Sequence, residues 1–150
     1  MGPVERMVRH HFHKDIMRYI TKELAGPRLD AAVAKALGIP YSLHLFKGNN
    51  KIGVADEWQC RAPDKCLPHE VGPIFCPSSY WPDGLPILDQ MSKTSYIQIV
   101  GGDGEWSCYT KCEISGGALL DHGPWGDGPT MLIAVMRALV ALKIGEAVEL

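Results

Sequence analysis

The strongest hydrophobic pattern in the chain lies close to its C-terminus. Across residues 129–143 (PTMLIAVMRALVALK) only Thr130, Arg137 and Lys143 are polar. Apolar residues recur there at helical spacing and also occupy much of the opposite face, which is typical of a helix buried on more than one side. Gly128-Pro129 suits the start of such a helix, and a glycine follows its end. The pattern predicts a central packing helix, too short to cross a bilayer comfortably.

Two further helical patterns lie in the N-terminal part of the chain. Residues 5–24 carry apolar residues four positions apart, at 12, 16, 20 and 24, which predicts an amphipathic helix. Residues 29–37 form a second apolar stripe that a glycine ends. A Gly-Pro step separates the two patterns. We therefore expect residues 1–25 to be an N-terminal helical appendage and residues 26–150 to be a single α/β sandwich domain.

The clearest strand signal is a pair of β-branched and aromatic runs. Residues 95–100 and 105–114 are such runs, and the glycine-dense segment 101–104 separates them, which predicts a hairpin. Alternation along the second run assigns one face to the core and leaves Ser107, Tyr109, Lys111 and Glu113 on the other. The core-facing set is Trp106, Cys108, Thr110, Cys112 and Ile114.

Between the N-terminal helices and this hairpin the pattern is weaker. Residues 41–46 and 53–58 are expected to form short strands. Residues 63–86 hold six of the eleven prolines and are expected to form a long, irregular excursion, and such excursions are usually functional or mobile. Residues 85–91 resemble a short helix with Leu88 and Met91 facing inward. The glycine- and proline-rich segment 116–129 is expected to be a loop.

Taken together, these elements predict an α+β fold. A small antiparallel sheet, consisting of the hairpin 95–100/105–114 plus short strands, is expected to be sandwiched by helices, with the long helix 129–143 at the C-terminal end.

Composition and charge narrow the class of protein. The formal net charge of the 150 residues is −2, which gives no footprint for non-specific nucleic-acid binding. We therefore consider a nucleic-acid partner unlikely on charge grounds. The N-terminus is charged and has no apolar core typical of a secretory signal, and no stretch has the length of a membrane span. We expect a protein of the cytoplasm, with no membrane partner and no cofactor.

The cysteines and histidines lack the sequence pattern of a metal site. Five cysteines without a signal peptide favour free thiols in a reducing compartment. Cys60, Cys66 and Cys76, with His69 nearby, lack the two-to-four-residue spacing of paired zinc ligands, so no metal site is expected. His10, His11 and His13 lie in the expected appendage and are interpreted as solvated residues.

Two segments contain candidate binding residues. Asp121-His122 and Trp125-Gly126-Asp127 place a histidine and a tryptophan between carboxylates just before the long helix. General acid–base catalysis needs its partners held within reach of one another, and no nucleophile can be placed beside His122 from sequence. Tyr80-Trp81 are large aromatic residues in the proline-rich region, and aromatic residues are enriched at binding hot spots. The candidate binding residues are Tyr80, Trp81, His122, Trp125 and Asp127, and no catalytic residue is assigned.

The order of motifs resembles a known family. The segment GPRLDAAVAKALG at residues 26–38 is followed by PSSY at 77–80, a strand containing Trp106, and AVMRAL at 134–139. This order, over about residues 26–143, resembles the phage and prophage α-β-α sandwich domain family, whose function is uncharacterised. The resemblance implies a sandwich fold and a phage-type context, and it supplies no catalytic residue.

Two functions from different classes follow as hypotheses. The first is a phage- or prophage-type accessory protein that acts, without catalysis, as a binding module on a host protein or a small signalling molecule in the bacterial host cell. Interference with a host defence system is one form of this hypothesis. The alternative is a small hydrolase-like enzyme that uses His122 with Asp121 or Asp127. A homodimer is also expected, because Met131, Val140 and Ile144 lie outside the stripe that a sheet would cover.

Overall fold

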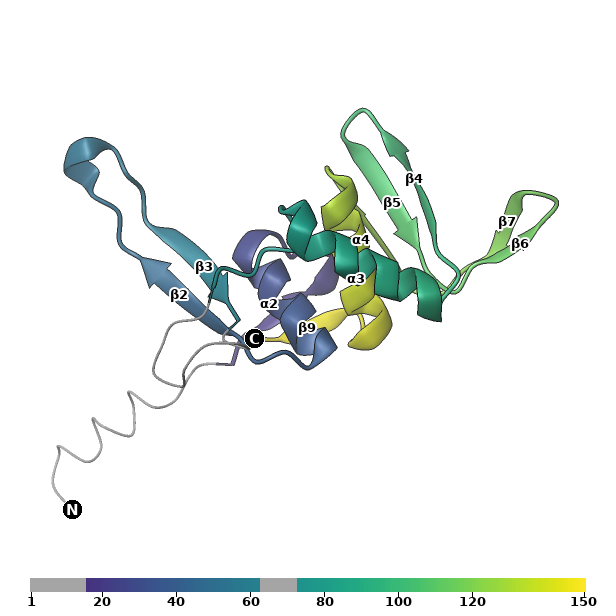
Figure 1. The fold of residues 1–150 in the computed structure, drawn as a ribbon, viewed down its shortest axis with the longest axis horizontal. Helices are drawn as coiled ribbons and strands as arrows, with labels where there is room; N and C mark the ends of the chain where they lie inside the picture. Colours follow the sequence, from purple (N-terminus) through teal and green to yellow (C-terminus); the bar gives the residue numbers. More distant parts are fainter. Residues whose placement is uncertain (1–15, 63–72) are drawn as a thin grey trace, which may run out of the picture.

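The computed structural model describes residues 16–62 and 73–150, and the predicted α+β class is confirmed. In the described residues, three α-helices accompany nine strands that pair only in small antiparallel sheets (Figure 1). The helices are α2 (Gly26–Leu37), α3 (Trp81–Thr94) and α4 (Met131–Lys143), and the 3-10 turns are η1 (Thr21–Glu23) and η2 (Asn50–Ile52). The strands are β1 (Arg18–Ile20), β2 (Ser42–Phe46), β3 (Glu57–Arg61), β4 (Gln98–Gly102), β5 (Glu105–Tyr109), β6 (Glu113–Ser115), β7 (Ala118–Asp121), β8 (Trp125–Gly128) and β9 (Ala147–Glu149).

The C-terminal helix α4 is the centre of the molecule, as its pattern predicts. It packs against β5 and β8 and also against α2 and α3. Its start is two residues later than expected, because the Thr130 hydroxyl caps the helix by accepting the N–H of Ile133. Val140 is fully buried within the chain, so the expectation that this residue needs cover from a second copy is wrong. The buried residues of α4 are Leu132, Ala134, Val135, Met136, Ala138, Leu139 and Val140.

A three-stranded sheet in the order β4-β5-β8 covers one side of α4. The β4–β5 hairpin is confirmed, and Asp103 and Gly104 form its turn with positive φ at both positions. This is the type I′ geometry that suits the twist of paired strands. Gly126 makes the contact with α4 possible, since a Cβ there would lie 2.4 Å from the backbone nitrogen of Ala138.

The second predicted strand is shorter than expected. Residues 105–114 do not form one strand, because β5 ends at Tyr109 and the chain turns at Lys111, whose φ is +47°. Ile114 therefore lies on β6, where it is exposed, and not on the core face. The segment 116–129 is not simply a loop either. It contains β7, which pairs with β6 in a second hairpin, and β8, which completes the central sheet.

Residues 16–24 are not part of the expected α-helix. Strand β1 pairs antiparallel with β9 at the C-terminal end of the chain, and η1 follows it. Thr21 and Leu24 are buried, so this segment contributes to the core of the molecule. Residues 1–15 lie outside the described residues, and their assignment to an appendage stays a prediction.

Arg137 of α4 links this N-terminal segment to the sheet. Its Nε donates to the carbonyl of Leu24 at 2.9 Å, and its Nη1 donates to the carbonyl of Asp127 at 2.7 Å. The only arginine in the apolar helix is therefore used to hold η1 and β8 against α4.

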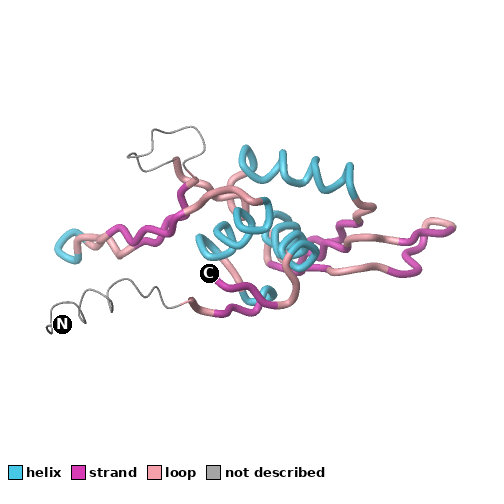
Figure 2. The backbone as a smooth tube through the Cα atoms, turned by 90° about the horizontal axis from the view of Figure 1, so that it is seen from below, coloured by secondary structure: helices cyan, strands magenta, loops and turns pink. Residues whose placement is uncertain are grey.

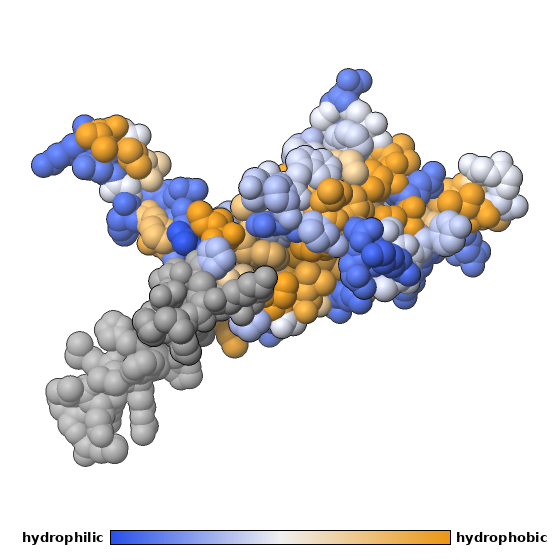
Figure 3. Space-filling model, viewed as in Figure 1, coloured by the Kyte–Doolittle hydropathy of each residue, from blue (hydrophilic) through white to orange (hydrophobic). Residues whose placement is uncertain are grey.

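The strands β2 and β3 form a hairpin that projects away from the helices (Figures 1 and 2). We call residues 42–61 the arm. Its first strand is close to the expected one, whereas the second begins at Glu57 and not at residue 53. Figure 3 shows apolar surface at the far end of the arm. Its exposed apolar side chains are Leu45, Phe46, Ile52, Val54 and Trp58.

The predicted helix at residues 85–91 exists but is longer. Helix α3 starts at Trp81, inside the segment expected to be irregular, with Pro82 in its first turn, where a missing N–H costs little. Ile87 and Met91 face the core, and Leu88 is partly buried against it. Of the expected excursion, residues 63–72 lie outside the described part of the chain.

Candidate functional site

The outer face of the β4-β5-β8 sheet carries a row of aromatic side chains. Tyr109 and Trp125 are direct cross-strand partners, and their rings stack with centroids 6.0 Å apart and planes 29° apart. The ring of His122 also contacts Tyr109, and the centroids of these two rings are 4.7 Å apart. The Lys22 ammonium lies 4.5 Å from the Trp125 ring centroid, a cation–π distance. We call His122, Tyr109, Trp125 and Lys22 the aromatic row.

Strand alternation and two local hydrogen bonds position the rings of the aromatic row. Alternation along β5 and β8 turns Cys108 and Gly126 toward α4, so their neighbours Tyr109 and Trp125 point outward. The Thr110 hydroxyl and backbone N–H both donate to the carbonyl of Pro124, which fixes the chain immediately before Trp125. The two rings are therefore held on a hydrogen-bonded scaffold.

A pocket of about 410 Å³ opens beside Trp125. Its floor and walls come from three regions: the β1–η1 segment, the start of β8 and the C-terminal end of α4. The Thr21 hydroxyl is already used, since it donates to the carbonyl of Gly145 at 2.7 Å. The lining residues are Ile20, Thr21, Lys22, Pro124, Trp125, Ala141, Gly145 and Glu146.

The described contacts do not assemble His122 and its neighbouring carboxylates into a catalytic pair. The Asp121 carboxylate accepts the backbone N–H of His122 at 2.8 Å, and the imidazole Nδ1 lies 2.7 Å from the carbonyl oxygen of Gly123. The carboxylate is thus engaged with the backbone and not with the ring, whereas acid–base catalysis depends on such ring contacts. His122 instead contributes its ring to the aromatic row.

The remaining predicted site residues lie elsewhere. Tyr80 and Trp81 are exposed at the start of α3, and Trp81 lines a separate, smaller pocket of about 230 Å³ beside the start of α4. Asp127 lines an open hollow of about 500 Å³ at the opposite end of β8, together with Glu105 and Arg137. The five predicted residues therefore do not form one site, and the structure brings together only His122 and Trp125.

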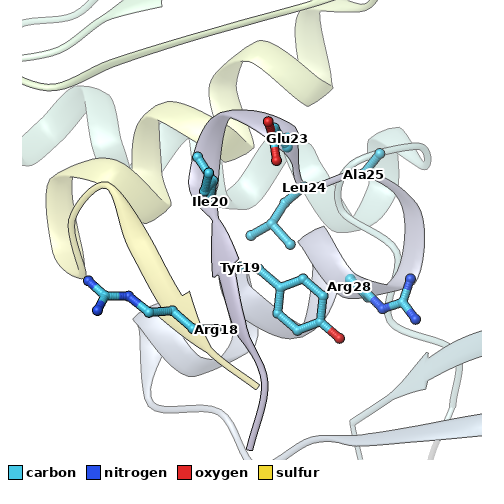
Figure 4. Close-up of a pocket in the computed structure, with 7 residues that line it drawn as sticks. All are labelled: Arg18, Tyr19, Ile20, Glu23, Leu24, Ala25 and Arg28. Atoms are coloured by element: carbon cyan, nitrogen blue, oxygen red, sulfur yellow. The ribbon is translucent and has the colours of Figure 1, made fainter.

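A further pocket, of about 420 Å³, lies where β1 meets α2 (Figure 4). Figure 4 shows Tyr19 and Arg28 close together on one side and Arg18 on the β1 side, turned away from them. The Arg28 guanidinium lies 5.5 Å from the Tyr19 ring centroid. This arrangement is a cation–π contact at the protein surface.

Sequence reasoning missed Lys22 and Tyr109 of the aromatic row and Glu146 of the pocket beside it. The alternation of the 105–114 run did place Tyr109 on the side opposite the core, so a signal for it existed. Lys22 and Glu146 come to the pocket through the β1–β9 pairing of the two ends of the described chain. No local pattern marks that pairing.

The interior also contains ionisable groups around the start of α3. Asp30 is buried, and its carboxylate accepts the N–H of Ser78 at 2.9 Å. Burial raises the pKa of Asp30 to about 6, against the lowering effect of the Ser78 hydrogen bonds. Asp83 accepts the N–H of Cys76 at 3.0 Å. The Asp30–Ser78 contact fastens the segment that precedes α3 to helix α2, and the Asp83–Cys76 contact fastens the same segment to α3.

The described cysteines Cys60, Cys76, Cys108 and Cys112 are free. Burial raises the pKa of the Cys60 and Cys108 thiols to about 12, so these two thiols stay protonated and behave as small apolar groups. Within residues 16–62 and 73–150, no group of three or more His, Cys, Asp or Glu residues is arranged to hold a metal ion. Cys66 and His69 lie outside these residues.

The comparison with known families identifies the class of protein. A family model for a phage protein matches most of the chain, over residues 21–143. The family is described as Bacteriophage P22, NinX, and the chain belongs to it. The predicted phage context is thereby confirmed, and the function of this family is uncharacterised. No curated protein matches the chain significantly.

Proposed function

We propose that this phage protein is a non-catalytic binding module and that the aromatic row, with the pocket beside Trp125, is its binding site. The observation that supports this most is the stacking of two half-buried rings, Tyr109 and Trp125, on the face of the sheet that is turned away from α4. Aromatic surfaces of this kind bind ligands through stacking and desolvation without chemical conversion.

The partner belongs to one of two classes, a small signalling molecule or a protein of the bacterial host. The concave pocket favours the small molecule, because a ligand of that size can be surrounded by the walls that β1, β8 and α4 provide. Interference with a host defence system is the biological form of this proposal. None of the helices in the described residues is long and apolar enough to cross a membrane. We place the protein in the host cytoplasm as part of the same proposal.

The test is capture of ligands from an extract of bacterial host cells on the immobilised full-length chain, followed by mass spectrometry of bound metabolites and proteins. The site variant combines Tyr109→Ser with Trp125→Ser, and the matched control is Trp81→Ser, an exposed tryptophan at the start of α3. Species that bind the unmodified chain and the control but not the site variant support the proposal. Species held equally by all three proteins contradict it.

The His122→Ala variant separates binding from catalysis. A binding module releases its ligand with unchanged mass, and His122→Ala weakens binding only moderately, because the ring contacts Tyr109 at the end of the row. Release of a chemically altered ligand that depends on His122 would instead establish the hydrolase-like alternative.

A further inference from the structure

We infer that the pocket beside Trp125 binds a guanine nucleotide, with the base stacked on Trp125, its N–H edge on Glu146 and its phosphate on Lys22. This inference rests on the proposed binding function and names the ligand class for the same site.

The first step concerns the flat wall of the pocket. Trp125 lines the pocket, whereas Tyr109 stacks on Trp125 without lining it. Tyr109 therefore supports the indole ring from outside and holds its plane fixed. A fixed indole plane is a stacking platform for a planar heterocycle, and base–aromatic stacking is tolerant of sequence but selective for flat ligands.

The second step concerns charge. Lys22 and Glu146 are the two charged residues among those that line the pocket, and neither takes part in a salt bridge within residues 16–62 and 73–150. Each side chain thus remains able to pair with a ligand. The Lys22 ammonium lies over the Trp125 ring, where it meets a weak cation–π partner on an exposed surface. An anionic ligand group offers that ammonium a stronger, charge-assisted hydrogen bond, and the base stacks on Trp125 once Lys22 has left the ring for that group.

The third step selects the ligand. A ligand that satisfies both charges carries an anionic group for Lys22 and N–H donors for the Glu146 carboxylate. Guanine presents a ring N–H and an exocyclic amino group side by side, which match the two oxygens of one carboxylate. Adenine presents an amino group beside a ring nitrogen that accepts, so one carboxylate oxygen would face a lone pair. A pocket of about 410 Å³ falls in the range of small-ligand sites.

The other pockets carry weaker arguments. In the described residues no second ring stacks on Tyr19 in the pocket at Arg18 and Arg28, whereas Tyr109 stacks on Trp125. The pocket at Trp81 is lined mainly by apolar and hydroxyl side chains. The exposed apolar face of the arm has no observed contact that identifies an occupant.

The experiment is isothermal titration calorimetry of the full chain with GMP, AMP and ribose 5-phosphate. We expect GMP to bind at least tenfold more tightly than AMP, and ribose 5-phosphate to bind more weakly than either. The three site variants are Trp125→Leu, Glu146→Gln and Lys22→Gln. Their matched controls, at exposed positions outside the pocket, are Trp81→Leu, Glu105→Gln and Lys51→Gln.

Each site variant has its own expected result. Trp125→Leu weakens GMP binding by about fivefold to 100-fold, the range of one base–aromatic stack. Glu146→Gln removes the preference for GMP over AMP. Lys22→Gln weakens both nucleotides similarly, and the controls change nothing. Ala141→Met serves as a second variant if Trp125→Leu lowers the melting temperature, because Ala141 lines the pocket and a longer side chain there fills it.

Three results would overturn the inference: no GMP binding at millimolar concentration, equal affinity for GMP and ribose 5-phosphate, or binding that the site variants do not alter. If the extract experiment nevertheless finds a different ligand that needs Tyr109 and Trp125, the inference fails while the binding function stands. If neither experiment finds a ligand that depends on these rings, both proposals fail.

Discussion

At the scale of single residues, burial changes the acid–base chemistry of Asp30. Its side chain is 3% exposed and accepts a backbone hydrogen bond from Ser78 across 48 residues of chain. Desolvation disfavours the charged carboxylate and raises its pKa from 3.8 to about 6, and the nearby Asp83 adds to this effect. The folded state therefore holds the Asp30 proton more tightly than the unfolded chain does.

This raised pKa predicts a pH dependence of stability. The contribution of protonated Asp30 is complete below about pH 3.8 and is lost as the pH rises through about 6. At about 1.4 kcal/mol per pKa unit, the loss is on the order of 3 kcal/mol. Asp30→Asn keeps an oxygen for the Ser78 N–H but cannot ionise, so its unfolding free energy should fall by less than that of the unmodified protein between pH 4 and 7.

Urea unfolding at several pH values measures this difference. Asp103→Asn, in the exposed β4–β5 turn, is the control and should keep the pH profile of the unmodified protein. Parallel profiles for Asp30→Asn and the unmodified protein would show that burial does not shift this carboxyl as described.

Two glycines of β8 provide a matched pair for packing. A Cβ added at Gly126 would lie 2.4 and 2.6 Å from backbone atoms of α4. A Cβ added at Gly128 would instead lie closest to the side chain of Ile133. Because a helix backbone yields less than a side chain, Gly126→Ala should destabilise the protein by about 3 kcal/mol. This corresponds to roughly 6–12 °C in melting temperature for a domain of this size. Gly128→Ala should cost clearly less, and equal losses in a thermal melt would contradict the close approach of β8 and α4.

At the scale of elements, the sequence predicted those whose signal is local. Helices α2 and α4 and the β4–β5 hairpin have a long periodic pattern or a marked turn, and each was located within a few residues. Strands β1, β8 and β9 are only three or four residues long, and two of the four residues of β8 are glycine. Their pairing depends on partners far along the chain, which no local pattern encodes.

The dependence of strand pairing on distant partners also limits prediction of the site. His122 and Trp125 were identified because aromatic and charged residues are concentrated before α4. Tyr80 and Trp81 shared that chemistry, but they lie at the start of helix α3, where Trp81 lines a different pocket. Lys22 was assigned to a helix, and only the pairing of β1 with β9 brings it over Trp125.

The pairing of β1 with β9 predicts where the N-terminus can be shortened. Deleting residues 1–15 leaves β1, Thr21 and Leu24 in place, so the melting temperature should change by less than about 3 °C. Deleting residues 1–24 removes the partner of β9 and two buried side chains, and the melting temperature should fall by more than about 8 °C. Circular dichroism melts of both truncations test this. A large fall with the shorter deletion would mean that residues 1–15 are part of the folded domain.

At the scale of the whole molecule, the exposed apolar surface lies only partly where the sequence analysis expected it. Of the three residues expected to need cover, Val140 is completely buried, Met131 is partly buried and Ile144 is 37% exposed. The arm instead carries Leu45 and Trp58, which are cross-strand partners and 38% and 45% exposed. Two-stranded hairpins have little stability by themselves in water. The expected homodimer stays a prediction, and if it forms, the apolar face of the arm is one surface that its contact would cover.

Substitutions in the arm and in α4 distinguish these two elements as the surface of self-association. Leu45→Glu places a charge on the apolar face of the arm, outside the core, so it should shift the protein toward monomer without lowering the melting temperature by more than about 3 °C. Val140→Glu buries an unpaired charge in the core, which is strongly unfavourable, and should unfold the protein instead of dissociating it. Lys51→Glu, at the tip of the arm but polar in the unmodified chain, controls for added negative charge.

Sedimentation velocity at tens of micromolar measures the oligomeric state of these variants, and thermal melts measure their stability. A folded, monomeric Val140→Glu variant would restore α4 as the interface, and an unmodified protein that sediments as a monomer would refute self-association.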